Sequence, residues 1–440
     1  MSAKREQAAV RILGALGTVA ALGLMLPTAQ AESLAEAWSL ALGNDAAYAA
    51  VKSQHDSASA DFAAARGARW PSLQVSAGET QLNDAPSLDI NTPAGALVSP
   101  KLWNHDRIGV ADAAISLPLY TSGQISAGIS AAQHHAEAAA AIETSAAQDL
   151  RFAVVDAYIG VLRSRRALAV AEAQVSGLTA HRDDVQVMYD KEAVALNDLL
   201  AARVATANAE QERLRAANML SVAAAAYNRL LGQPLDRLPE LEVIVPPAGI
   251  AGSATLEELL SQAVRARPEL QADATETLAL GDQAAAERAR GGPQLALTAG
   301  YNHFDNTFLN RQDFASVGVG VRWTIFDGGQ SAQRAAALRS AARASSQQMA
   351  DRQSRIELEV REAWLSRETA ASRLAASGEA VAQSEENLRI ARELYRSGMG
   401  TNTQVLDAET LRATSTSNRD NAQLDLVLAG YRLQHAVGNL

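Results

Sequence analysis

Residues 323–333 read WTIFDGGQSAQ, and residues 117–127 read LPLYTSGQISA. In both stretches an apolar, strand-like run ends in a Gly-Gln step, and a long alanine-rich segment begins. A chain that repeats the same strand-to-helix transition contains either a chance echo or two copies of one structural unit. The rest of the sequence decides between these two explanations.

Paired landmarks elsewhere in the chain favour a duplication. One pair of strand starts lies 222 positions apart, Pro71-Ser72-Leu73 and Pro293-Gln294-Leu295. Later pairs keep a constant offset of 206: Tyr189 with Tyr395, and Gly232 with Gly438. A longer loop in the first copy, rich in Pro, Asn and Asp as turns are, explains the difference. We therefore expect three parts after a leader: a first repeat at 32–232, a linker at 233–255 and a second repeat at 256–440.

The start of the chain has the features of a secretory signal peptide at 1–31. A basic beginning is followed by the apolar run Ile12–Leu26, which is too short to span a bilayer, and then by Ala29-Gln30-Ala31, a small-x-small cleavage site. The mature chain is expected to begin near Glu32, outside the cytoplasm. No later segment approaches 18 uninterrupted apolar residues.

Composition excludes several functions. The net charge of −10 argues against a nucleic-acid partner, and the absence of cysteine excludes disulfides, thiolate metal sites and cysteine nucleophiles. The adjacent pair His134-His135 points to different sides of a helix and makes a poor metal site. No H-E-x-x-H, G-x-S-x-G or paired-carboxylate motif is present. We expect no catalytic site, no cofactor and no metal.

Four segments alternate apolar and polar residues with period two, which predicts strands with one apolar face. Each has the length of a tilted membrane strand, and we place them at 71–82, 109–120, 293–304 and 315–326. Aromatic residues near their ends suit an interfacial girdle: Tyr120, Tyr301, Phe304, Phe314, Trp323 and Phe326. A half-buried sheet in a soluble sandwich has the same alternation. In lipid an open sheet edge is forbidden, so four strands require several chains per barrel, two giving eight strands and three giving twelve.

Two very long helices are predicted after the Gly-Gln steps, over 124–188 and 330–395. About 65 residues at 1.5 Å each span about 100 Å. A seam repeats every seven residues in the second of them, at Leu374, Val381, Leu388 and Tyr395. Returning helices at about 197–231 and 403–437 close two helical hairpins. A soluble periplasmic coiled-coil scaffold is the alternative, but it does not explain the strands before each long helix.

In this order the motifs resemble the TolC family of outer-membrane efflux proteins. The resemblance rests on the duplication, the P-x-L strand starts, IFDGGQ, the Leu230-Leu231-Gly232 ending and the hairpin motif Tyr395-Arg-Ser-Gly-Met-Gly-Thr-Asn-Thr-Gln-Val-Leu-Asp407. It implies a mainly α fold with a β-barrel part, in which three chains form a 12-stranded barrel and an α-barrel tunnel. It also implies location in the outer membrane, spanning into the periplasm.

The same resemblance implies the partners and the function. A periplasmic adaptor and an inner-membrane pump of RND or ABC type would supply small toxic compounds to the channel, with no enzymatic step in the chain itself. The alternative within the family is the outer-membrane component of a type I protein secretion system.

Three groups of residues are candidates for function. The resemblance places a tunnel constriction at Asp407, Gln404, Tyr395, Asp198 and Tyr189. Adaptor contacts are expected at the hairpin tips: Glu192, Ala193, Val194 and Ala195 in the first repeat, and Gly398, Met399, Gly400 and Thr401 in the second. Gly398 and Gly400 suit a turn with positive φ, and Glu192 in place of a glycine leaves the first turn open. The barrel–tunnel junction is expected at Gly123, Gln124, Asp327, Gly328, Gly329 and Gln330, with Asp327 as a helix N-cap.

Overall fold

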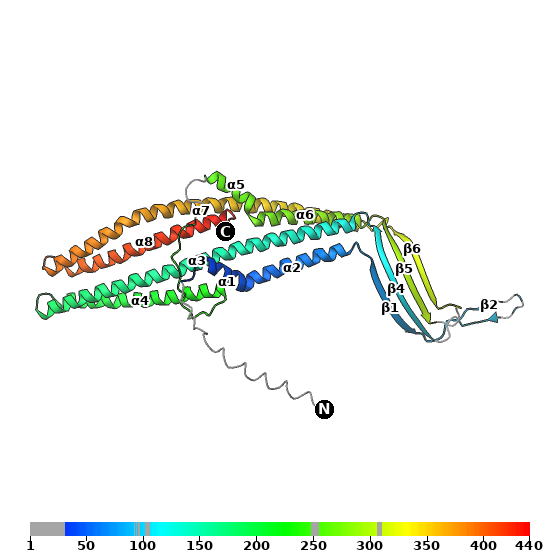
Figure 1. Cartoon of the computed structure of the whole chain (residues 1–440), viewed down its shortest axis with the longest axis horizontal. Coiled ribbons are helices and arrows are strands. Elements are labelled where there is room, and N and C mark those ends of the chain that lie inside the picture. Colours follow the sequence, from blue (N-terminus) through cyan, green and yellow to red (C-terminus); the bar gives the residue numbers. More distant parts are fainter. Residues whose placement is uncertain are drawn as a thin grey trace, which may run out of the picture.

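The computed structural model describes residues 31–91, 93, 95, 97–101, 106–247, 255–305 and 310–440. Nearly all of the predicted signal peptide therefore lies outside the described residues. The molecule is long and mainly helical, with one small sheet at one end and two hairpin tips at the other (Figure 1).

Both halves of the chain contain the same series of elements. The first half consists of α1 (Leu34–Asn44), α2 (Ala46–Gly67), β1 (Ser72–Gln81), β2 (Ile90–Asn91), β3 (Leu97–Val98), β4 (Arg107–Tyr120), α3 (Gln124–Asp190) and α4 (Leu196–Leu231). The second half consists of α5 (Leu256–Ala266), α6 (Pro268–Ala289), β5 (Gln294–Asp305), β6 (Asp313–Arg322), α7 (Gln330–Arg396) and α8 (Asn402–Ala436). Only the small β2–β3 hairpin has no counterpart among the described elements of the second half.

The main sheet is antiparallel throughout, in the order β1-β4-β5-β6. The prediction of a strand up to residue 326 was wrong, because β6 ends at Arg322. Arg322 pairs with Gln294, the first residue of β5, so the neighbouring strand offers no further partner. Residues 323–326 leave the sheet, and Ile325 and Phe326 are 80% and 86% exposed.

The helices continue the order of the strands. Each strand joins one helix of the body: α2 precedes β1, β4 leads into α3, α6 precedes β5, and β6 leads into α7. Accordingly α2 packs on α3, α3 on α6 and α6 on α7. Farther from the sheet, α4 packs on α3, α3 on α8 and α8 on α7. The chain is thus an arc four elements wide over its whole length, with β1, α2 and α4 along one edge and β6 and α7 along the other (Figure 1).

Small residues let the long helices pack closely. The helices α3 and α7 contain 67 residues each, about 100 Å at 1.5 Å per residue. Buried small side chains recur at heptad spacing on α7 (Ala363, Ala370, Ser384, Ala391) and on α8 (Ala408, Ser415, Ala422, Ala429, Ala436). Of the predicted seam, Val381, Leu388 and Tyr395 are buried, whereas Leu374 is only partly buried. The heptad pattern is that of a coiled coil.

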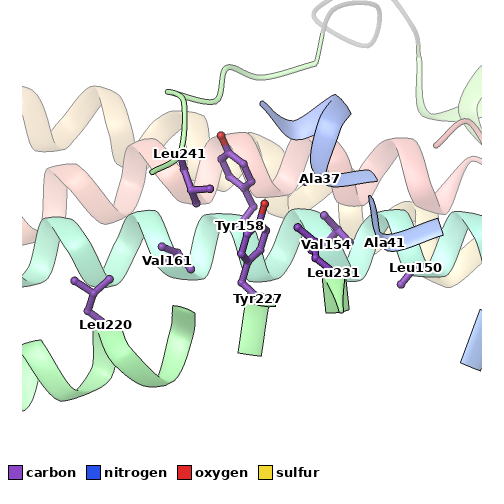
Figure 2. Packing of buried hydrophobic residues seen from close by; sticks show 10 residues of the cluster. All are labelled: Ala37, Ala41, Leu150, Val154, Tyr158, Val161, Leu220, Tyr227, Leu231 and Leu241. Carbon is purple, nitrogen blue, oxygen red and sulfur yellow. The ribbon is translucent and has the colours of Figure 1, made fainter. Parts of the chain in front are cut away.

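A compact core joins the first repeat to the linker halfway along the molecule. Its side chains come from α1, α3, α4 and the linker (Figure 2): Ala37, Ala41, Leu150, Val154, Tyr158, Val161, Leu220, Tyr227, Leu231 and Leu241. The Tyr158 hydroxyl lies 2.9 Å from the carbonyl oxygen of Glu32, and the Tyr227 hydroxyl donates to the Glu32 carboxylate at 2.7 Å. The beginning of the described chain is thereby fixed to both helices of the first hairpin, α3 and α4.

Candidate functional site: the hairpin tips, the junction and the sheet

The two hairpin tips have the same backbone turn. Glu192 has a φ of 59° and Gly398, 206 positions later, a φ of 75°. Each amide donates to the residue three positions earlier, Glu192 to Tyr189 at 2.8 Å and Gly398 to Tyr395 at 3.0 Å. The first repeat thus places a non-glycine residue in the left-handed region, which favours glycine.

Gly400 has a different role from the one predicted. Its φ is not positive, so the expectation of a second left-handed glycine was wrong. A Cβ at this position would lie 3.0 Å from both the Leu394 Cβ and the Tyr395 amide nitrogen. Glycine is needed here because the chain passes close to the end of α7.

The predicted adaptor contacts form the exposed end of the molecule. Met399, for example, is 75% exposed, and only Val194 and Gly400 are half-buried. Apart from Glu192 and Thr401, these tip residues are apolar or lack a side chain, and an exposed surface of this kind is suited to contact another protein.

The predicted constriction residues do not share one environment. Asp407 and Gln404 are exposed on α8, and Asp198 and Tyr189 are half-buried. The Gln404 side chain accepts from the Thr401 amide at 2.9 Å and completes a capping box at the start of α8. Tyr395 is only 5% exposed. Its side chain packs inside the chain, so it offers little surface to line a tunnel in this conformation.

A polar node that the sequence did not reveal joins the four helices near the tips. The buried His181 of α3 lies 2.7 Å from the Asn402 side-chain oxygen of α8, and its ring contacts the Tyr395 ring of α7 at 5.2 Å between centroids. Asn402 in turn donates to the carbonyl oxygen of Asp198 in α4 at 3.1 Å. Burial lowers the pKa of His181, which favours the neutral ring.

A buried carboxylate lies next to this node. Glu409 of α8 is fully buried and is paired with Arg392 of α7 and Arg412 of α8. It faces Gly177 of α3, where a Cβ would lie 2.8 Å from the Glu409 Oε1 atom. Two arginines surround the carboxylate and reduce the cost of its burial. No local motif marks the contact between Gly177 and Glu409, because the two residues lie 232 positions apart in the sequence.

A second charged cluster lies at the end of α8. His435 Nε2 lies 2.8 Å from the Asp149 carboxylate of α3, and its Nδ1 lies 3.5 Å from the Glu359 carboxylate of α7. Burial lowers the pKa of His435, but hydrogen bonds with Asp149 and Glu359 outweigh it and raise the pKa to about 9. The bond with His435 also lowers the pKa of Glu359 despite its burial. The cluster therefore joins three helices with a charged histidine.

The junction between sheet and helices depends on left-handed residues. Gly123 and Gly329 are the N-caps of α3 and α7, with φ values of 90° and 82°, directly before Gln124 and Gln330. Asp327 is therefore not the N-cap as predicted. It lies two residues earlier, and its carboxylate accepts from the amides of Gly329 and Ser331, both at 2.8 Å. Gly328 has a φ of 70°, and its counterpart Ser122 a φ of 53°.

The strand register separates an apolar from a polar face. Leu117, Leu297 and Val319 form one row across three strands, and the next row is Ile115, Ala299 and Val317. The one row between them consists of Ser116, Thr298 and Gly318. Farther along the strands, the same face carries the polar row of Ser76, Asp112 and Asn302. The sheet thus has one face suited to lipid and one suited to water.

Two of the expected girdle aromatics lie on the polar face. Phe314 pairs with Asn302, and Phe304 pairs with Val110, whereas Leu297 and Val319 point to the opposite face. Including Phe304 and Phe314 in a lipid-facing girdle was therefore wrong. Their proximity to the strand ends suggested it, but their even positions place them with the polar residues.

The described ranges contain neither a metal site nor a helix that could cross a membrane. Among these residues no group of three or more His, Cys, Asp or Glu side chains is arranged to hold a metal ion. Within the same residues, no helix combines the length and the apolar character needed to cross a membrane.

Paired helical hairpins joined to an amphipathic sheet define the class of outer-membrane export channels. The family model described as "Outer membrane efflux protein" matches residues 37–233 and 259–439, and the chain belongs to this family. Its members are channels rather than enzymes.

Named relatives agree with this assignment. Outer membrane protein TolC of Vibrio cholerae is 23% identical over 433 residues, covering 96% of this chain and 94% of the relative. The cobalt-zinc-cadmium resistance protein CzcC of Cupriavidus metallidurans is 28% identical over 244 residues, 54% of this chain and 56% of that protein. The solved structure of the outer membrane protein VceC from Vibrio cholerae superposes with a TM-score of 0.77 at 19% identity, covering 92% of this chain and 96% of that one.

Proposed function

We propose that three copies of this chain form one outer-membrane channel, with a 12-stranded barrel continued by a helical tunnel. The observation that carries the proposal is the open arc with its amphipathic sheet. The outer edges of β1 and β6 have no partner strand within the described sheet. Lipid does not tolerate unpaired backbone groups, so the sheet must close with other chains.

The helical edges of the arc support the same assembly. Exposed apolar side chains are frequent on α4 (Leu196, Leu200, Val204, Leu214, Met219, Val222) and on α7 (Leu358, Leu365, Ile390, Leu394). These helices lie at opposite edges of the arc. When one edge of a copy binds the opposite edge of the next copy, the copies form a closed ring if the rotation between neighbours divides a full turn evenly. Three chains give twelve strands, within the range of single barrels.

The proposed channel passes small toxic compounds that a pump and a periplasmic adaptor deliver. The exposed tips around Glu192 and Gly398 are the proposed adaptor contacts, because they lie at the end opposite to the sheet (Figure 1). The polar face of the sheet provides a water-filled lumen. The printed name of CzcC concerns resistance to cobalt, zinc and cadmium, which makes metal cations one cargo class to test beside drugs.

Asp407 is the proposed selectivity residue of the tunnel. It is exposed on α8, one turn after Gln404, and three copies would form an acidic ring that favours cations. We expect Asp407→Asn to weaken the cation preference and change the conductance of trimers in planar bilayers. Unchanged selectivity would contradict the ring.

The central experiment is membrane fractionation. We expect a heat-sensitive trimer in the outer-membrane fraction. Recovery of the protein wholly in the soluble periplasm would overturn the proposal in favour of a coiled-coil scaffold. Deletion of the gene then separates cargo classes, because drug or metal sensitivity indicates efflux, and loss of a secreted polypeptide indicates type I secretion.

A further inference from the structure

The aromatic pair Phe304 and Phe314, here called the inner aromatic pair, lies on the wrong face for a lipid girdle. It shares the polar face with the row of Ser76, Asp112 and Asn302. Large apolar side chains on a water-facing surface need an explanation. Apolar surface left exposed to water does not stabilise the wall of a channel, and it often marks a place where another molecule binds.

The two rings form one unit at the end of the sheet farthest from the helices. Their centroids are 6.0 Å apart with an interplanar angle of 67°, an edge-to-face arrangement. Phe304 is followed by Asp305, the last residue of β5, and Phe314 follows Asp313, the first residue of β6. Phe314 remains 42% exposed, so ring surface is available to a solute.

The neighbouring residues extend this apolar surface toward the next strand. Val110 of β4 stands opposite Phe304 in the register. Phe314 ends the row that contains Asn302 and Asp112, and the Asp112 carboxylate accepts from Ser76. A solute leaving along this face would therefore meet the ring of Phe314 at the height of the polar groups of Asp112 and Asn302, and then Phe304 and Val110 one row farther out.

We propose that the inner aromatic pair forms, three times around the barrel, an apolar collar that binds the hydrocarbon or aromatic part of exported molecules as they leave. This inference rests on the proposed trimeric barrel. It assigns the cargo a chemical class, amphiphilic molecules with an apolar part, and it assigns Phe304 and Phe314 a role in specificity.

The dimensions suit such a collar. Twelve strands spaced about 4.8 Å and tilted about 40° enclose a barrel about 24 Å across. Three pairs of phenyl rings that project inward, a third of the circumference apart, narrow this opening by roughly half. The collar contacts a drug-sized molecule without closing the path. Hydrated ions gain nothing from phenyl surface, whereas apolar groups leave water on contact.

The first test concerns which face the pair occupies. The chain has no cysteine, so single cysteines report their own accessibility. We expect Phe314→Cys to react with a membrane-impermeant thiol reagent at least ten times faster than Ala315→Cys, its neighbour at nearly the same height on the opposite face. Equal rates, or a faster reaction at residue 315, would overturn the inward position of the pair.

The second test concerns binding. Tetrapentylammonium is added to the outer side of purified wild-type trimers in planar bilayers, and tetramethylammonium serves as the probe with the same charge and little apolar surface. We expect tetrapentylammonium to block the current. In the double variant Phe304→Ser/Phe314→Ser, we expect the ratio of the half-blocking concentration of tetrapentylammonium to that of tetramethylammonium to rise about tenfold. The control variant Phe326→Ser should leave this ratio unchanged.

The outcomes separate the two proposals. Trimers that conduct no ions would refute the channel itself. Conducting trimers with no block, or with the same half-blocking concentration in the double variant, would refute only the collar. If the serine variant fails to form the heat-sensitive trimer, Phe304→Gln/Phe314→Gln removes the apolar surface with side chains longer than serine, and an unchanged block by tetrapentylammonium relative to tetramethylammonium in it refutes the collar.

Discussion

The turn at the first hairpin tip places Glu192 in a conformation that a glycine adopts without strain. Its φ of 59° corresponds to the 75° of Gly398 in the second tip. A left-handed conformation costs a non-glycine residue about 1–2 kcal/mol, and replacing Glu192 by glycine removes this strain. The greater freedom of glycine in the open chain offsets roughly 0.5–1 kcal/mol of that stabilisation. We expect Glu192→Gly to stabilise the closed turn by about 0.5–1 kcal/mol.

The reciprocal change gives the matched experiment. A Cβ at Gly398 would meet nothing within 4 Å, so Gly398→Ala changes only the backbone preference. We expect it to destabilise the second tip by a similar amount, about 0.5–1 kcal/mol.

Amide hydrogen exchange of the purified trimer measures local opening at each tip directly. The amide of Glu192 donates to Tyr189 at 2.8 Å and that of Ala193 to Met188 at 2.9 Å. Exchange of these amides should slow about two- to fivefold in Glu192→Gly, and the equivalent amides at the second tip should exchange faster by the same factor in Gly398→Ala.

Glu192→Ala is the control, because it removes the carboxylate and keeps the Cβ. It should exchange as the wild type does. If Glu192→Ala slows exchange as much as Glu192→Gly, the charge and not the backbone is responsible, and the argument from φ fails.

Three further predictions concern the body and the sheet. Gly177→Ala should lower the melting temperature of the trimer, because its Cβ would lie 2.8 Å from the buried Glu409 carboxylate. The control Gly160→Ala should not lower it, because a Cβ at this position of the same helix meets nothing within 4 Å. Equal melting temperatures of the two variants would contradict the contact with Glu409. His435 has a pKa of about 9 in the fold against about 6.5 unfolded, so its stabilisation, about 3 kcal/mol, is complete below about pH 6.5 and is lost as the pH rises through 9. His435→Gln should remove this dependence from thermal unfolding curves; a persistent slope would assign it to another group. Val319→Lys places a charge on the apolar face and should cost about 2–4 kcal/mol, seen as reduced trimer in outer-membrane extracts, and normal trimer levels would argue against a lipid-facing position.

The sequence indicated the elements because their signals are local. Period-two alternation marked the strands, and the long uninterrupted segments marked α3 and α7, which begin at Gln124 and Gln330 after glycines with positive φ. One available signal was missed. The even positions of Phe304 and Phe314 already assign them to the polar face, but they were grouped with the girdle by their nearness to the strand ends.

Contacts between distant segments could not be predicted in this way. The end of β6 at Arg322 depends on where its neighbour β5 begins. The burial of Tyr395 and Glu409 depends on α8 packing against both α3 and α7, and the composition of any one helix does not contain that information.

The sequence by itself therefore determined the duplicated plan, the faces of the strands and the glycines of the turns, since backbone sterics and hydrophobic periodicity act over a few residues. Only the tertiary structure decided which distant residues come into contact: Gly177 faces Glu409, His181 lies beside Asn402, and His435 lies between two carboxylates. Burial and charge pairing depend on helices that come together from distant parts of the chain, and these contacts control how firmly the two hairpins are joined.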